Sequence, residues 1–339
     1  MLFGDRLARG IVDIGQRLAF RTAAIGGGWP GKKGEIAMAF GNRNPLSLPV
    51  LKGPAVDRSV TASHGRFDSM VTVVCTRWLD AFPASYVTVL RNAVAASLKR
   101  PHRFVCVTDN PGGLENGVEG VAMPDLGIPL QYQRRGCWPK LSIFTPGLLP
   151  ADQPTLYLDL DVMVRQDLDA FFERIESTGG FHALREWNPT IWSMVPLAMR
   201  PHRGVQGSIL GFYPGEQAKL FHRFYDQKEL CFDAFPLDQD FLSENAQSPQ
   251  DWPFAWTSSF KWHCLHYYPI NQVLTKIHEP KNAKVVVFHG NPRPIDVVPL
   301  GDYRWGTKRK FGHGPVDWVR DYWLRHDPTW TDAAPAKAA

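Results

Sequence analysis

The chain has 339 residues, of which 44% are hydrophobic and 21% charged, an ordinary balance for a globular protein with a full core. Its 38 basic and 33 acidic residues give a formal charge of +5, too mild to predict a nucleic-acid partner, which would need a clustered basic stripe. The small positive balance suits an anionic small-molecule substrate, or a peripheral contact with anionic lipid.

Cysteine usage and hydropathy bound the cellular setting. The five cysteines are widely spaced and form no CxxC pair, so neither a disulfide framework nor a zinc site is expected. No apolar run reaches the length of a transmembrane helix, and the N-terminus lacks a signal-peptide core. We therefore predict a cytoplasmic protein, with peripheral contact at the inner membrane as an open alternative.

In chain order, the composition first shifts near residue 68. Residues 1–68 are rich in Gly, Pro and Arg, and we predict a poorly ordered or loosely docked extension. After this point β-branched runs alternate with helical stripes. The expected elements are strands at 70–76, 104–108 and 121–123, with a helix at 85–100 and another near Pro139.

The second half of the chain continues this alternation. The expected elements are strands at 155–161, 180–184, 208–213 and 284–290, with helices at 216–227 and 316–323. Alternation of this kind predicts an α/β fold whose mixed sheet is mostly parallel and has helices on both faces. We expect one domain over 69–325 and a disordered tail over 326–339.

Polar residues follow the expected strands at the edge where α/β sheets bind ligands. They are Thr76, Arg77 and Trp78 after the first strand, Asp109 and Asn110 after the second, Asp159 and Asp161 in the next long run, and His289 with Gly290 after the last. Their shared position predicts one common site.

The stretch "TLYLDLDVMV" carries Asp159 and Asp161 among apolar residues. On one strand, residues two apart point to the same side, about 6–7 Å from each other. A carboxylate in such surroundings needs a positive partner. The charge is balanced in one of three ways: by a Lys or Arg, by exposure to solvent at a strand edge, or by a bound cation such as Mg²⁺ or Mn²⁺. His289 is the candidate third ligand, since an imidazole favours Mn²⁺; its other interpretation is an ordinary core or loop histidine.

Three ordered motifs carry a resemblance to a known family. "TLYLDLDVMVRQDLDAFF", "PLDQDFLSEN" and "VVVFHGNPRP" together resemble nucleotide-sugar glycosyltransferases of the GT-A fold, with family 8 and related bacterial proteins the nearest in pattern, over roughly residues 70–300. The resemblance implies transfer of a sugar from a nucleoside diphosphate donor, with retention of its anomeric configuration as in family 8. It also divides the domain into a nucleotide-binding half, about 69–165, and an acceptor half, about 166–300. A UDP-sugar is the expected donor, Mn²⁺ or Mg²⁺ the cofactor, and a glycan, lipid-linked sugar or protein the acceptor.

The resemblance also assigns roles at the metal and the diphosphate. Asp159 would contact the metal and the donor ribose, Asp161 would be the principal metal ligand, and His289 would complete the metal site. Arg293 would hold the diphosphate where the family usually has Lys, a change of geometry as well as of residue. The family's tryptophan after the following proline is replaced by Ile295.

Further donor contacts are implied for Lys140 and for the loop after the first strand, Thr76, Arg77 and Trp78. Lys140 has the alternative of an ordinary surface lysine at a helix start. Trp78 would either stack on the base or cap the sheet.

The motif "LDQDFL" implies catalytic or acceptor-side roles for Asp238 and Gln239. Asp238 could equally be the N-cap of a helix over 239–245. Where the family normally has Asn-x-Gly, this chain has Gln206, Gly207 and Ser208, so the acceptor side departs from the family pattern.

Three other functions match parts of the sequence. "GGGWPGKK" imitates a phosphate-binding loop, but Lys33 stands where Ser or Thr should be, and Pro30 removes a backbone donor. Nucleotide transfer onto a sugar phosphate would need a Gly-rich basic loop after the first strand, which "CTRWLDAFP" does not supply. A catalytically silent nucleotide-sugar-binding protein on the same fold is the main alternative.

Overall fold

The computed structural model describes residues 69–331, apart from 80, 189–191, 193, 194, 267, 269, 275, 302 and 306–311. The chain divides into two compact units, residues 1–63 and 64–339, and every described residue belongs to the second. The predictions for the 1–68 extension and for residues 332–339 lie outside the described residues. The tail does not begin at 326, because a helix runs through His326 and the described chain continues to Thr331.

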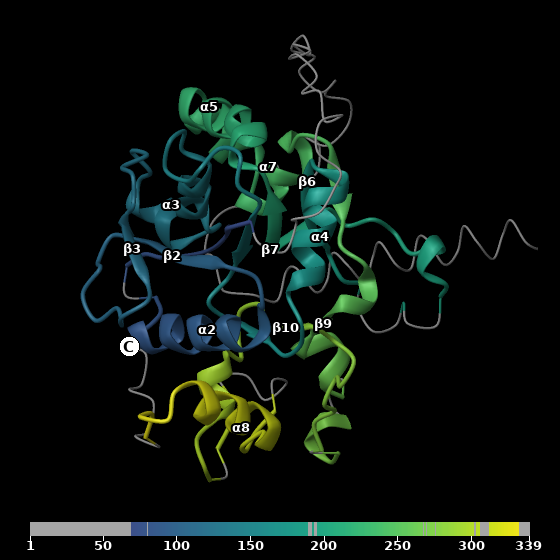
Figure 1. Ribbon diagram of the computed structural model, residues 1–339. Coiled ribbons are helices and arrows are strands. Elements are labelled where there is room, and N and C mark those ends of the chain that lie inside the picture. Colours follow the sequence, from purple (N-terminus) through teal and green to yellow (C-terminus); the bar gives the residue numbers. More distant parts are fainter. Residues whose placement is uncertain are drawn as a thin grey trace, which may run out of the picture. The chain divides into compact units, whose positions relative to one another are not determined.

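A seven-stranded sheet with the order β3-β2-β1-β4-β7-β6-β8 forms the centre of the unit (Figure 1). Its strands are β1 (Val71–Arg77), β2 (His102–Thr108), β3 (Glu119–Ala122), β4 (Thr155–Leu158), β6 (Phe181–Arg185), β7 (Val205–Phe212) and β8 (Pro249–Asp251). β1 pairs in parallel with β2 and β4, and β2 with β3. Only β7 runs against its neighbours β4 and β6. The expected mostly parallel mixed sheet is confirmed.

A second, three-stranded sheet has the order β5-β10-β9, with β5 at Val162–Val164, β9 at Thr257–Ser259 and β10 at Val285–Val287. β4 therefore ends at Leu158 in the large sheet, and β5 begins at Val162 in the small one. The expectation of one continuous strand through Asp159 and Asp161 is wrong. The two aspartates lie in the turn where the chain passes from one set of backbone partners to the other.

Helices cover both faces of the large sheet. The main ones are α2 (Ala84–Ser97), α3 (Leu130–Arg134), α4 (Asp169–Thr178), α5 (Ala218–Asp226), α6 (Lys228–Ala234), α7 (Asp238–Asn245) and α8 (Asp317–His326). Shorter helical turns are η1 (Trp138–Phe144), η3 (Leu197–Met199), η4 (Pro214–Gln217), η5 (Phe254–Trp256), η6 (Phe260–Cys264), η7 (Ile270–Gln272) and η8 (Pro294–Val297). None of the helices in the described ranges has the length and apolar character needed to cross a membrane.

The core has two parts because side chains alternate between the faces of each strand. On β1, Val73 and Cys75 pack into the cluster that includes α2, α4 and α8, while Val74 packs into the cluster with η1, α5 and α7. Figure 1 shows α2 and α8 on one side of the sheet and α5 and α7 on the other. This packing fixes the carboxyl ends of β1 and β4, where the polar residues of the next section lie.

Candidate active site

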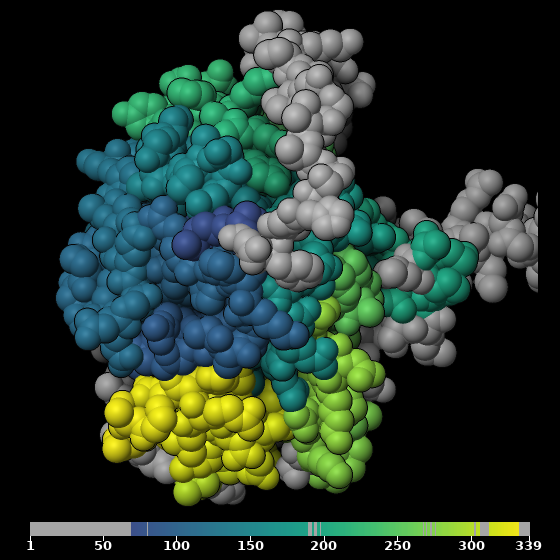
Figure 2. All heavy atoms as spheres, in the orientation of Figure 1, coloured from purple at the N-terminus to yellow at the C-terminus, as the bar shows by residue number. Residues whose placement is uncertain are grey.

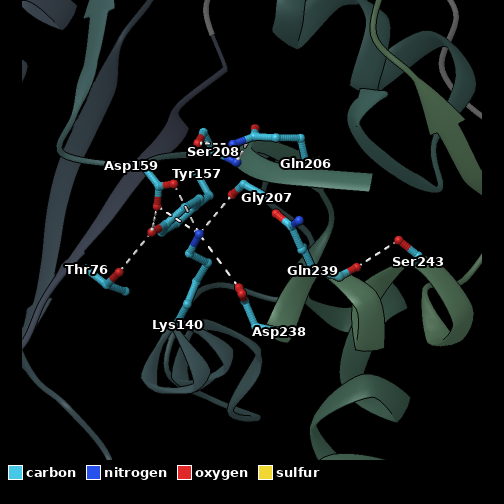
Figure 3. Close-up of polar contacts among 10 residues, drawn as sticks. All are labelled: Thr76, Lys140, Tyr157, Asp159, Gln206, Gly207, Ser208, Asp238, Gln239 and Ser243. Atoms are coloured by element: carbon cyan, nitrogen blue, oxygen red, sulfur yellow. Dashed lines mark hydrogen bonds and ion pairs between the residues drawn. The ribbon is translucent and has the colours of Figure 1, made fainter. Parts of the chain in front are cut away.

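Lys140 is the centre of a buried polar cluster (Figure 3). Its Nζ lies 2.9 Å from Oδ1 and 3.2 Å from Oδ2 of Asp159. The same ammonium group donates to the carbonyl oxygen of Gly207 at 3.1 Å and lies 3.7 Å from Oδ2 of Asp238. Lys140 thus joins the residue implied for the donor to the residue implied for the acceptor side.

The sequence around Lys140 explains its burial. Cys137 has a left-handed backbone, with φ of 55°, and starts η1, in which every residue is buried. Lys140 itself is only 3% exposed, so the surface-lysine alternative is wrong. Burial alone would lower the pKa of Lys140, but the carboxylates of Asp159 and Asp238 raise it above its ordinary value. Lys140 therefore stays charged.

Tyr157 and Thr76 hold Asp159 from the other side. The Tyr157 hydroxyl donates to Asp159 Oδ1 at 2.6 Å and lies 2.9 Å from Thr76 Oγ1. The two residues come together because β1 and β4 are parallel neighbours, with Val74 opposite Tyr157. Sequence reasoning missed Tyr157, although its position two residues before Asp159 was the signal that could have found it.

β7 supplies the third wall of the cluster through Gln206, Gly207 and Ser208. Gln206 Nε2 donates to Ser208 Oγ at 2.7 Å, and the Ser208 N–H donates back to Gln206 Oε1 at 2.9 Å. The Ser208 carbonyl accepts the N–H of Asp159 at 2.9 Å. A Cβ on Gly207 would lie 3.4 Å from Lys140 Nζ, an ordinary contact distance, so the lysine packs directly against this strand.

α7 presents Asp238 and Gln239 to the same place. Asp238 is the first residue of the helix, and its N–H donates to the Gly136 carbonyl at 2.8 Å. Leu237 is the N-cap, so the N-cap alternative for Asp238 is wrong. Asp238 is 4% exposed, and its Oδ2 has no hydrogen-bond partner among the described residues, leaving it facing Lys140. In Figure 3 the Gln239 side chain lies beside Gly207 and Asp238.

The cluster holds more acidic than basic groups in a buried place. Burial, reinforced by Asp159, raises the pKa of Asp161 to about 8, although Lys140 and Arg293 act in the opposite direction. Burial and Asp159 likewise raise the pKa of Asp238 to about 7, against the effect of Lys140. A cation or a developing positive charge at this point would relieve that strain.

These pKa values predict how the stability of the metal-free protein varies with pH. Asp161 and Asp238 bind protons more tightly in the folded chain than in the unfolded chain, where their pKa is near 3.8. As far as these groups act, stability should therefore be highest below about pH 4 and should fall as the pH rises from about 4 towards 8. Urea unfolding in EDTA from pH 5 to 8 measures this, and Asp238→Asn should flatten the fall. A slope unchanged in Asp238→Asn would contradict the prediction for that residue.

The imidazole of His289 does not contact Asp159 or Asp161. Its Nε2 lies 2.7 Å from Ser259 Oγ, and its ring stacks on Trp187 with 5.5 Å between centroids. Burial and the nearby Lys261 lower the pKa of His289 to about 3, so it is neutral. Its backbone is close to the acidic turn, because the Phe288 N–H donates to the Asp161 carbonyl at 3.0 Å. The imidazole, however, is engaged with residues other than the two aspartates.

A three-ligand metal centre is therefore not assembled. The described ranges contain no group of three His, Cys, Asp or Glu side chains that could hold a metal ion. The chemistry of Asp159 and Asp161 still fits a hard cation, since both offer carboxylate oxygens and Asp161 carries an unfavourable buried charge. The pair fits such an ion, while His289 in its present position does not.

This difference gives a test of His289. We expect His289→Gln to leave Mn²⁺ affinity within about two-fold of wild type, because the ring contacts Ser259 and Trp187. The same change should lower the free energy of unfolding by about 1 kcal/mol through the lost packing and hydrogen bond. Calorimetric titration with Mn²⁺ and urea unfolding measure the two effects. A ten-fold loss of Mn²⁺ affinity would show that His289 is a ligand.

Arg293 and Arg77 have structural partners. Arg293 Nη1 donates to the Ala81 carbonyl at 2.6 Å, and the guanidinium lies 4.5 Å from the centre of the Phe82 ring. Its charge still acts on Asp161. Arg77 is 7% exposed and donates to the carbonyls of Phe82 at 3.0 Å and Asn110 at 2.8 Å. Arg77 therefore fastens the loop after β1 to the end of β2.

Trp78 joins the same loop to the start of the next helical region. Its Nε1 donates to the Gln133 carbonyl at 2.9 Å, and the side chain is half-buried. This contact ties the loop after β1 to α3. Both roles considered for Trp78, stacking on the base and capping the sheet, stay predictions.

Solved structures with similar folds are glycosyltransferases. The chain is 14% identical, with a TM-score of 0.50, to galactosyltransferase LgtC in complex with donor and acceptor sugar analogues; the match covers 77% of this chain and 96% of that one. An active-site glutamine-to-glutamate mutant of LgtC gives 15% identity, the same TM-score of 0.50 and the same coverages of 77% and 96%. The bifunctional glycosyltransferase WbbM gives 14% identity, a TM-score of 0.47, and coverages of 78% and 50%. No protein-family model and no curated protein matches the chain.

The fold is thus that of the GT-A glycosyltransferases, as the three sequence motifs implied. The narrower resemblance to family 8 stays a prediction.

Proposed function

We propose that this chain is a glycosyltransferase that moves a sugar from a nucleoside diphosphate donor, with a UDP-sugar as the expected donor, to a glycan, lipid-linked or protein acceptor. One observation carries the proposal. Within a GT-A fold, Lys140 joins Asp159 of the donor-side motif to Asp238 of the acceptor-side motif in a buried cluster at the carboxyl ends of β1 and β4.

In the proposed reaction, the bond between the anomeric carbon and the β-phosphate oxygen breaks, and a bond from that carbon to an acceptor hydroxyl oxygen forms. The hydroxyl proton leaves with the diphosphate or passes to a carboxylate. Negative charge develops on the leaving phosphate, and Lys140 with Arg293 supplies positive charge on that side of the cluster. The site acts mainly by positioning and electrostatics.

A divalent cation, Mn²⁺ or Mg²⁺, would be held by the carboxylates of Asp159 and Asp161 and would supply Lewis-acid stabilisation of the leaving diphosphate when bound. The buried, unfavourable charge of Asp161 supports this part of the proposal. Asp159 would also orient the donor, since Tyr157 and Lys140 fix its carboxylate.

We propose that the reaction retains the anomeric configuration and that Asp238 and Gln239 are the residues responsible. Their position beside Gly207, next to Lys140, puts a carboxylate and an amide on one side of the cluster. Either group could stabilise positive charge on the anomeric carbon while the acceptor attacks the same face. Alternatively, the Asp238 carboxylate could form a covalent intermediate.

The deciding experiment is a panel of nucleoside diphosphate sugars, incubated with the full chain and Mn²⁺, with release of nucleoside diphosphate as the readout. Wild type should release it from at least one donor, and release should stop in EDTA. Asp161→Asn is the site variant and Asp167→Asn the matched control, because Asp167 pairs with Lys284 at 3.6 Å outside the cluster. Metal-dependent donor binding with no release from any donor would favour the silent binding protein.

We also propose a cellular location for the reaction. All five cysteines are free in the structure, which supports the predicted reducing, cytoplasmic location.

A further inference from the structure

The segment after β9 folds into a closed loop. The His278 N–H donates to the Cys264 carbonyl at 3.0 Å, which joins the two ends of what we name the 264–278 loop. At the far end, the N–H groups of Val273 and Leu274 both donate to the Ile270 carbonyl, at 3.0 and 2.9 Å. Figure 1 shows this segment continuing from β9 away from the large sheet. The described residues 270–274 therefore form a hydrogen-bonded turn. In Figure 2 the light-green segment that includes the loop forms the lower right of the face in view.

The tip presents large apolar side chains to solvent. The exposed fractions are 55% for Tyr268, 38% for Ile270, 82% for Val273 and 51% for Leu274. The loop is nevertheless anchored, since Asn271 in its middle is only 5% exposed. Exposed apolar residues scattered singly are normal, but a group of this kind on a fixed turn marks a contact surface.

Exposed lysines follow the tip. Lys276 and Lys281 lie on its C-terminal side, and the side chains of His266 and His278 are also exposed. Glu279 is the only acidic residue from position 260 to 284, and it is paired with Arg165. An exposed apolar tip next to lysines is complementary to an anionic lipid surface, whose headgroups attract the lysines while the apolar side chains enter the interface.

We propose that the 264–278 loop docks the protein onto an anionic membrane surface. A discrete pocket for one small anion is a weaker explanation. The cavity of about 750 Å³ beside the loop is lined by Lys276 and Lys281 but also by Asp317 and Asp321, so its charges are mixed. The tip itself carries no such acidic groups, which favours a diffuse contact through Ile270, Val273 and Leu274.

The docking loop is linked to the candidate active site through η6. Lys261, three residues before the loop, donates to the His289 carbonyl. The backbone N–H of Phe288, the residue before His289, donates to the Asp161 carbonyl at 3.0 Å. If the proposed function holds, the contact would bring the site to a lipid-linked acceptor. Docking itself does not depend on that function.

The test is flotation of the full chain with vesicles of phosphatidylcholine, alone or mixed with phosphatidylglycerol. Wild type should float with the mixed vesicles and not with phosphatidylcholine alone. Val273→Ser with Leu274→Ser should weaken binding about ten-fold or more. Leu230→Ser is the matched control, since Leu230 is 61% exposed on α6, and it should bind as wild type does.

The electrostatic part is tested separately. Lys276→Gln and Lys281→Gln should each weaken binding about five-fold, which corresponds to about 1 kcal/mol, and added salt should do the same. Thermal unfolding establishes that each variant is folded. Release of nucleoside diphosphate from a soluble donor should be unchanged in the loop variants.

Two outcomes would overturn the proposal. The first is that wild-type protein stays unbound in the bottom fraction of the gradient with both vesicle types. The other is a concentration-dependent dimer that the Val273→Ser, Leu274→Ser protein no longer forms, because the loop would then contact a second copy of the chain. Absence of donor cleavage with intact flotation would count against the proposed function alone.

Discussion

Replacing Asp161 by Asn should reduce release of nucleoside diphosphate by about 100-fold or more and at the same time stabilise the fold. The two effects have one cause. Asp161 is buried, and burial with the nearby Asp159 raises its pKa to about 8, so near neutral pH part of its charge is held at a cost. An amide of the same shape removes that cost but also removes a negative oxygen from the proposed cation site.

The stability gain should depend on pH. A carboxyl with a raised folded-state pKa lowers stability progressively as pH rises from about 4 to 8, so the variant should gain most at pH 8, by about 1–3 kcal/mol. Urea unfolding in EDTA at pH 5 and pH 8 measures it. Added Mn²⁺ should raise the melting temperature of wild type and not of Asp161→Asn.

Asp167→Asn is the control for both measurements, because Asp167 pairs with Lys284 on a more exposed part of the chain. That variant should keep full release and gain no stability at pH 8. Full release by Asp161→Asn would remove the cation from the proposed reaction.

The large sheet was predictable because its strands have strong local signals. The β-branched run before Thr76 and the apolar run before Asp159 are each buried throughout as strands. Such runs have few alternatives to a central strand between helical layers. Helices on both faces followed from the alternation, and the structure has them.

The break between β4 and β5 could not be predicted, since it is a property of pairing partners. Leu160 and Val162 continue the apolar pattern through the acidic turn, and both are buried. The antiparallel pairing of β5 with β10, which begins with Val162 opposite Val287, takes the chain into a second sheet. The assumption that both aspartates share one strand face failed for that reason.

The candidate site was partly predictable. Motif spacing indicated Lys140, Asp159 and Asp238, and the structure brings these residues together. Spacing could not show that His289 turns to Ser259, because side-chain direction after β10 depends on the packing of Trp187. The burial of Lys140 was also hidden, since it depends on the left-handed residue Cys137 and on the fit of η1 against α5 and α7.

Lys140→Met should be the most damaging substitution in the cluster. Among the described residues, Lys140 is the one basic group that contacts both Asp159 and Asp238, at 2.9 and 3.7 Å. Methionine has a similar length but no charge, so two acidic groups would be left facing each other in a buried place. Breaking a buried ion pair from one side costs about 3–5 kcal/mol. We expect a loss of that size at pH 8 in urea unfolding.

The loss should be smaller at pH 5, because Asp238, with a pKa of about 7, can then take up a proton. Lys284→Met is the matched control: its Nζ lies 3.6 Å from Asp167, and that pair is more exposed, so its removal should cost less than about 1 kcal/mol. Equal losses in the two variants would mean that the buried cluster has no special role in stability. Lys140→Arg keeps the charge but changes its geometry. It should recover part of the stability and little of the diphosphate release, because a planar guanidinium cannot reproduce the contacts that one ammonium makes with Asp159, Asp238 and the Gly207 carbonyl.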